Sequence, residues 1–152
     1  MEPLGRVALL AVSGLVVAGC GSTASHATTG TGPSALPRIH ESFTLLPCPH
    51  GKTARGTTVG IEGCLEHAIV GLDTRIRTAE RSGLALVGAS GRRSLVRAER
   101  GWLHYRREFC TAEASGYAGG TLQPVIFAEC VARANREHLA ALVALMQANG
   151  NN

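Results

Sequence analysis

Cysteines are the residues of this chain with the most distinctive chemistry, because thiols bind metals, act as nucleophiles or pair as disulfides. Cys20 lies near the N-terminus, and four others follow at Cys48, Cys64, Cys110 and Cys130. A zinc site is disfavoured, since there is no C-x-x-C pair and the histidines lack regular ligand spacing. The sequence therefore predicts no metal site and no cofactor, and favours two disulfides with three possible connectivities.

The sequence-local pairing is the one we predict for the four later cysteines: Cys48 with Cys64 and Cys110 with Cys130. Each disulfide would close a loop of roughly 15 to 20 residues and contribute on the order of 3 kcal/mol on the chain-entropy model. A domain of about a hundred residues has only a modest core, so two such bonds would supply a large part of its stability.

No arrangement of serine, histidine and carboxylate side chains indicates catalysis. Ser115 precedes a glycine, but no G-x-S-x-G elbow surrounds it, and it lies at the end of a predicted helix rather than after a strand. Three of the six histidines fall one to each predicted helix, at His67, His104 and His138. We predict that the protein is not an enzyme.

The N-terminus, residues 1–19, has the features of a secretory signal peptide. A single basic residue, Arg6, precedes an apolar run that is about half as long as a bilayer-spanning helix. The run ends in VAGC, which resembles the lipobox of bacterial lipoproteins and implies cleavage before Cys20 and lipid attachment to it. We therefore expect export to the cell envelope and membrane anchoring through Cys20. The alternative is an ordinary cleaved signal with an incidental cysteine.

A polar segment follows, and residues 20–47 are predicted to form the lipidated N-terminus and a flexible tether. Its first part, Gly21–Pro37, is rich in Gly, Ser and Thr and has almost nothing to bury. The folded domain is expected over residues 48–148 as one helical, cysteine-rich unit, with a frayed tail at residues 149–152.

Helical periodicity runs through three segments of that domain. In the first, apolar residues recur at three- and four-residue steps: Leu65, Ala68, Ile69, Leu72, Ile76 and Ala79. We expect this helix to stop near Gly83, a loop to follow, and the second helix to begin near Arg92. The third has Pro124 in its first turn and the stripe Ala128, Val131, Asn135, Leu139, Leu142 and Met146. The predicted fold is all-α, a three-helix disulfide-stapled bundle after a disordered lipoprotein tether.

The second helix contains AERGWLHYRREFC, residues 98–110, in which aromatics are interspersed with arginines and glutamates. Such a stretch suits a nucleic-acid strip, a membrane-surface helix or the seam of a small bundle. Trp102, Tyr105 and Phe109 recur at helical spacing on one stripe, and such a stripe is more often core than ligand platform. We predict that these three residues form part of the structural core.

A formal net charge of +4 and a pI near 9.1 raise the possibility that the protein binds nucleic acid. The export signal and the glutamates among the arginines argue against it, so we expect no nucleic-acid partner. A solvated basic surface near anionic lipid is the simpler explanation, in which arginines add weak, salt-screened adhesion.

Several motifs together resemble one known family. They are the spacing W-x-x-Y-R-x-x-x-C from Trp102 to Cys110, the Gly119-Gly120 pair, Cys130, and CLEHA around Cys64. They resemble the LprI-like lysozyme-inhibitor family, small secreted or lipid-anchored bacterial envelope domains with a Cys-rich helical fold. The resemblance implies a non-catalytic protein that inhibits lysozyme by protein–protein binding. The alternative function is a structural or assembly lipoprotein that binds another component of the cell envelope.

Four positions depart from the pattern of that family: Asp73, Glu99, Asn135 and His138 stand where its members commonly have Asn, Gln, Thr and Arg. The charge is a further difficulty, because familiar host lysozymes are basic and so is this domain. Like charges give no steering of the encounter, so inhibition would depend on a local loop.

The best candidate for that loop is the glycine-rich segment between the second and third helices: Ser115, Gly116, Tyr117, Gly119, Gly120 and Thr121. Glycines allow close backbone approach, the hydroxyl groups can hydrogen-bond, and Tyr117 offers a rigid anchor. The alternative is a hinge whose glycines only turn the chain.

Overall fold

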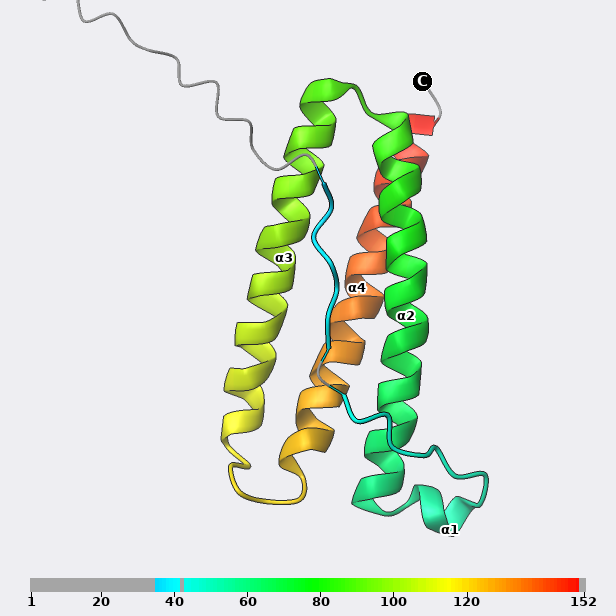
Figure 1. Ribbon diagram of the computed structural model, residues 1–152, viewed down its shortest axis with the longest axis vertical. Coiled ribbons are helices and arrows are strands. Elements are labelled where there is room, and N and C mark those ends of the chain that lie inside the picture. Colours follow the sequence, from blue (N-terminus) through cyan, green and yellow to red (C-terminus); the bar gives the residue numbers. More distant parts are fainter. Residues whose placement is uncertain (1–34, 42, 151–152) are drawn as a thin grey trace, which may run out of the picture. The chain divides into compact units, whose positions relative to one another are not determined.

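The computed structural model describes residues 35–41 and 43–150 and contains three long helices (Figure 1). Each long helix runs antiparallel to the one before it in the sequence. They are α2 (Thr58–Leu86), α3 (Ala89–Ser115) and α4 (Gln123–Gly150), and a single-turn helix, α1, spans Lys52–Arg55. The described residues contain no strand, so the fold is all-α as predicted. The predicted count of three omits α1, which buries no residue and has no apolar periodicity to indicate it.

Local signals fix where the long helices begin. The Thr57 hydroxyl accepts a hydrogen bond from the Gly60 N–H at 3.1 Å, so Thr57 caps the N-terminus of α2. Pro124 lies in the first turn of α4, where its missing N–H costs no intrahelical hydrogen bond. α4 continues to Gly150, beyond the predicted end of the helical domain at residue 148. No helix within the described ranges is long and apolar enough to cross a membrane.

Gly83 does not end the first long helix, contrary to the prediction. It is buried within α2, where an added Cβ would lie 3.5 Å from the side chain of Leu95 and 3.9 Å from that of Leu145. Both distances are ordinary van der Waals contacts, and the packing of α2 against the bundle outweighs the low helix propensity of glycine. The predicted loop is therefore only Val87 and Gly88, and α3 begins at Ala89 rather than near Arg92.

α4 is the central helix of the bundle, because it packs against both α2 and α3 while those two have few contacts with each other. Most of its predicted stripe is buried: Ala128, Val131, Asn135, Leu139 and Leu142. α2 contributes Ile69, Leu72, Ile76 and Ala79 to the same core. Two disulfides in the sequence-local pairing reinforce this core. Cys48–Cys64 joins the end of the segment before α1 to α2, and Cys110–Cys130 joins α3 to α4.

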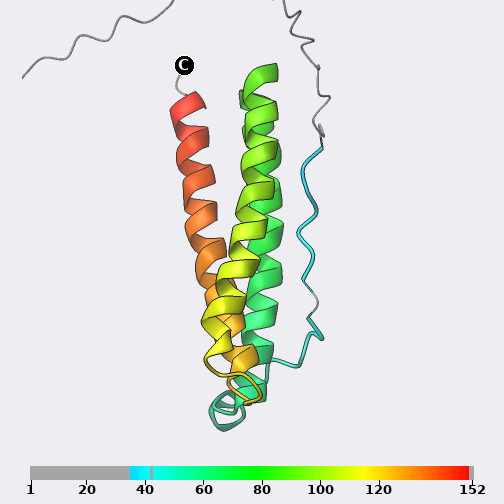
Figure 2. The same cartoon turned by 90° about the vertical axis from the view of Figure 1, so that its left-hand side faces the viewer.

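An extended segment, which we call the strap (residues 35–41 and 43–47), lies along α2 and α3 on the side opposite α4 (Figures 1 and 2). Ile39 and Phe43 pack against the core, and the Leu46 N–H donates to the Glu66 carboxylate at 2.7 Å. The prediction of a flexible tether is wrong for this part of residues 20–47. Its two apolar side chains and its backbone hydrogen bonds to the bundle make the strap a fourth packed element.

The inward face of α3 also differs from the prediction. Tyr105 and Phe109 are 59% and 46% exposed, so they are not core residues, while Trp102 is partly buried against the core. The buried side of α3 instead consists of Leu95, Val96, Glu99, Arg106, Cys110 and Ala114. This face is rotated by about one residue, or roughly 100°, from the aromatic stripe. The rotation follows from the disulfide, which turns Cys110 toward α4, and from polar partners that accept Glu99 and Arg106 inside.

Candidate functional site

The loop between α3 and α4, residues 116–122, forms an exposed tip at the same end of the bundle as α1 (Figure 1). Consecutive turns fix its backbone, with hydrogen bonds from the Tyr117 N–H to Ala114 O and from the Gly120 N–H to Tyr117 O. Gly119 has a φ of +77°, which favours glycine, and its N–H donates to the Gln123 side chain at 3.1 Å. The loop thus has a defined shape, and it brings the six predicted binding residues together.

Two links between α3 and α4 hold this loop in place. The Cys110–Cys130 disulfide brings the two Cα atoms to 5.4 Å, and Arg133 of α4 pairs with Glu113 of α3 at 2.6 Å. A loop closed between cross-linked helices loses less conformational entropy when it binds a partner. The arrangement therefore suits a preorganised recognition element.

The surface beside the loop is apolar and hollowed. Tyr117 and Leu122 of the loop are each 45% exposed, and a shallow depression of about 360 Å³ lies where α3 ends and α4 begins. Its lining comes from both helices: Thr111, Ala114, Gln123, Pro124 and Phe127. An exposed aromatic on the loop and an apolar hollow at its base are features that can anchor a protein partner.

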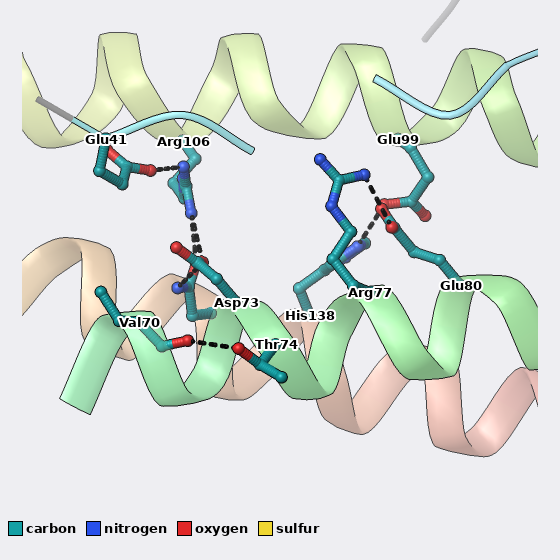
Figure 3. A network of polar contacts seen from close by, with 10 residues as sticks. Glu41, Val70, Asp73, Thr74, Arg77, Glu80, Glu99, Arg106 and His138 are labelled. Carbon is teal, nitrogen blue, oxygen red and sulfur yellow. Dashed lines mark hydrogen bonds and ion pairs between the residues drawn. The ribbon is translucent and has the colours of Figure 1, made fainter. Parts of the chain in front are cut away.

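Inside the bundle, buried polar side chains form two clusters, drawn in Figure 3. The first, the Arg106 cluster, joins all four elements: Arg106 pairs with Glu41 of the strap, donates to Asn135 of α4 at 2.6 Å and lies 3.5 Å from Asp73 of α2. Asn135 in turn donates to Asp73 at 2.8 Å. Because each charge has an opposite charge or a hydrogen bond, burying this cluster is tolerable.

The second cluster contains Glu80 of α2, Glu99 of α3 and His138 of α4 (Figure 3). The His138 ring lies 2.7 Å from Glu99 and stacks on Trp102 with centroids 3.7 Å apart. Arg77 donates to Glu80 at 3.1 Å and also to the strap carbonyl of Pro37. This Glu80–Glu99 cluster therefore connects the strap with all three long helices.

Burial shifts pKa values in both clusters. It raises the pKa of Glu80 to about 7, with Arg77 opposing the change and the neighbouring Glu99 adding to it. One Glu80 oxygen has no hydrogen-bond donor, so a proton shared with Glu99 would satisfy it. Burial likewise raises the pKa of Asp73 to about 6 and lowers that of Arg106 to about 10, which leaves Arg106 cationic at neutral pH.

The three histidines do not converge on a site. His67 and His104 are exposed on their helices, and only His138 enters a cluster. Among the described residues, no group of three or more His, Cys, Asp or Glu side chains is arranged to hold a metal ion. Cys20, the predicted lipidation site, lies outside the described residues.

Hydrophobic patterning missed the charged interior residues, which are Glu66 and Glu80 of α2 and Glu99 and Arg106 of α3, since charged residues count as outward-facing. A signal for the two on α3 was present in the sequence. Cys110 must face its partner, and helical steps of four and eleven residues back from it reach Arg106 and Glu99 on the same face.

A comparison with known families agrees with this architecture. The family described as "Lysozyme inhibitor LprI" matches residues 48–142, more than half of the chain. The chain belongs to this family. Searches of curated proteins and of solved structures give no match. The strap precedes the matched region, so this packed element is an addition to what the family match covers.

The four departures from the LprI pattern noted above fall into two contacting pairs. Glu99 contacts His138, and Asp73 accepts a hydrogen bond from Asn135. These four residues therefore complement each other across α2, α3 and α4, and their buried polar groups are paired.

Proposed function

We propose that this protein is an exported envelope lipoprotein, anchored through Cys20, that inhibits lysozyme by non-catalytic binding. Membership of the LprI lysozyme-inhibitor family carries the proposal. The exposed and cross-linked loop at residues 116–122 supports it, because an inhibitor needs a rigid protrusion to enter the cleft of an enzyme.

The proposed mechanism is occlusion. Tyr117 is the anchor, the glycines beside it let the partner backbone come close, and the depression lined by Pro124 and Phe127 receives a side chain of the enzyme. Long-range attraction between two basic proteins is absent, so affinity comes from apolar contacts and hydrogen bonds at this tip. No covalent bond forms.

The test uses residues 21–152, exported behind an unrelated cleavable signal so that the disulfides form. Lysis of bacterial cell walls by lysozyme is measured with the wild-type chain, with Tyr117→Ala and with Tyr105→Ala. Tyr117→Ala should weaken inhibition by about 2 kcal/mol, roughly thirtyfold, since Tyr117 is an interface anchor. Tyr105→Ala removes a similarly exposed ring from α3 and should leave inhibition unchanged.

Two results would contradict the proposal. If the wild-type chain inhibits no lysozyme of any type, the alternative of an assembly lipoprotein that binds another envelope component takes its place. If Tyr105→Ala weakens inhibition more than Tyr117→Ala, the enzyme binds to α3 and not to the loop.

A further inference from the structure

The acidic and basic residues of this protein are distributed very differently between interior and surface. Of eleven acidic residues, Glu66, Glu80 and Glu99 are at most 2% exposed, and the side chains of Glu41 and Asp73 are 14% and 17% exposed. Among the fifteen basic residues, Arg106 is the only one within the described ranges that is buried. The solvent therefore meets a surface considerably more positive than the formal charge of +4 indicates.

Much of this positive charge lies in one row along α3, which runs past the start of the strap. We call it the basic rim: Arg38 of the strap with Arg93, Arg97, Arg100 and Arg107 of α3. Helical steps of three and four residues place the α3 members in one row about 20 Å long. Of the exposed acids on α3, Glu113 is paired with Arg133 of α4, and Glu108 lies beside the row and pairs with Arg107 at 3.4 Å.

A hollow of about 360 Å³ opens in the basic rim between the strap and α3. Arg38, Arg100, Arg106 and Arg107 line it, and its carboxylate, Glu41, is already paired with Arg106. Arg106 is 4% exposed, and its Nε has no hydrogen-bond partner. Guanidinium groups around a hollow of this size suit a phosphate group, which they bind through paired hydrogen bonds.

We propose that the basic rim is a docking surface for an anionic phospholipid bilayer, with a headgroup phosphate seated in the hollow. A straight row on a convex helix fits a flat charged surface better than a polymer, which needs a groove.

The course of the chain agrees with this orientation. The strap begins at the rim, where Arg100 donates to the carbonyl of Ala35 at 3.1 Å. Ala35 lies 15 residues after Cys20 (35 − 20), a length that spans at most about 50 Å. The docking proposal rests on the proposed anchoring through Cys20, which keeps the rim close to a bilayer. It does not depend on lysozyme binding.

The test measures binding of residues 21–152, which contain the whole compact unit Thr31–Asn152, to lipid vesicles by flotation. Vesicles of phosphatidylcholine alone are compared with vesicles that contain phosphatidylglycerol. Each arginine near an anionic surface adds about fivefold in affinity, so Arg93→Gln/Arg97→Gln/Arg107→Gln should bind the anionic vesicles about a hundredfold more weakly. The control, Arg75→Gln/Arg81→Gln/Arg136→Gln, removes the same charge from exposed positions on α2 and α4 and should bind nearly as well as wild type.

The proposal requires three things: binding that depends on phosphatidylglycerol, a much larger loss for the rim variant than for the control, and little competition from inorganic phosphate at matched ionic strength. Equal losses in the two variants would mean that only net charge matters, and would overturn it. Release by inorganic phosphate would also overturn it, because it indicates a site for the free anion. Tighter rim-dependent binding to a soluble polyanion such as dextran sulfate would do the same.

The rim variant should keep its thermal midpoint and its lysozyme inhibition, and Tyr117→Ala should keep vesicle binding, so either proposal can fail alone.

Discussion

Arg106 shows how a single buried charge organises this bundle. Its guanidinium pairs with Glu41 of the strap, lies near Asp73 of α2, donates to Asn135 of α4 and sits 4.9 Å over the ring of Trp102. The desolvation of one cation is thus offset by partners from every neighbouring element. After its removal Glu41 would lose its ion-pair partner, and Asp73 would keep only the influence of Arg77.

Arg106→Met should therefore lower the free energy of unfolding by about 3–5 kcal/mol, the cost of breaking a buried pair by removing one partner. Arg107→Met is the control, because the neighbouring Arg107 is exposed; it should change stability by less than about 0.5 kcal/mol. Denaturant unfolding of both variants measures the difference. Equal free energies of unfolding would show that the contacts of Arg106 make no net contribution to stability.

Glu80 makes stability depend on pH. Burial raises its pKa to about 7 in the folded protein, against about 4.5 in the unfolded chain, so the folded state binds the proton more tightly. This contribution is fully present below pH 4.5 and is lost as the pH rises through 7. Asp73, whose pKa burial raises to about 6, acts in the same direction over a lower range.

Unfolding free energies measured from pH 4.5 to pH 8 should therefore fall with pH, with a Glu80 contribution on the order of 3 kcal/mol. Glu80→Gln, which cannot ionise, should flatten the part of this slope near pH 7 and leave the part due to Asp73. Glu108→Gln, at an exposed position, should leave the whole slope unchanged. A stability that rises between pH 5 and 7 in the wild type would contradict the assignment.

Among the elements, the strap depends on a single glycine for its place beside α2. It comes so close to α2 at Gly63 that an added Cβ would lie 2.5 Å from the carbonyl oxygen of Pro47 and 2.8 Å from that of Leu46. Those atoms belong to the backbone beside the Cys48–Cys64 disulfide, which limits how far they can move. Glycine at this position is thus required by a close approach and not by an unusual φ.

Gly63→Ala should displace the strap and cost about 1–3 kcal/mol, the range for an overpacked contact. Gly71→Ala, in the same helix with open space around it, should instead stabilise by up to about 1 kcal/mol through helix propensity. Hydrogen exchange at the Leu46 amide, which is bonded to Glu66, should become faster in Gly63→Ala only. Unchanged exchange there would mean that the strap tolerates the extra methyl group.

For the whole molecule, the two proposals give separate binding roles to different parts of the chain. The lipid anchor and the basic rim bind the membrane, and the loop tip binds the enzyme. The rim borders the start of the strap, whereas the loop lies beyond the Cys110–Cys130 disulfide at the end of the bundle that holds α1 (Figure 1). A protein held at a bilayer through its rim would leave the loop tip accessible to a soluble enzyme. Anchoring through Cys20 is the part of this arrangement that can be tested separately.

Cys20→Ala should abolish labelling of the chain by a radioactive or alkyne-tagged fatty acid, because the thiol is the attachment point for the lipid. Retention in the detergent-soluble membrane fraction should fall as well, to the level that rim adhesion alone supports. Cys130→Ser, which removes a cysteine of the folded domain, serves as the control and should keep the label. Unchanged labelling of the Cys20→Ala chain would contradict the lipoprotein assignment.

The sequence by itself determined the helical class, the core stripes of α2 and α4 and the exposed loop, because these follow from local periodicity and from residues that turn the chain. It also pointed to the LprI family, through motif spacing. Tertiary structure alone decided the course of the strap, the continuation of α2 past Gly83 and the inward face of α3. In each of these, partners distant in sequence outweigh a local preference. Leu95 and Leu145 pack over Gly83. Arg106 is buried where patterning expected Tyr105, because Asp73, Asn135 and Glu41 pair with it. A hydrophobic pattern cannot report such gains, because the partner that makes burial of a charge favourable is not among the neighbours in sequence.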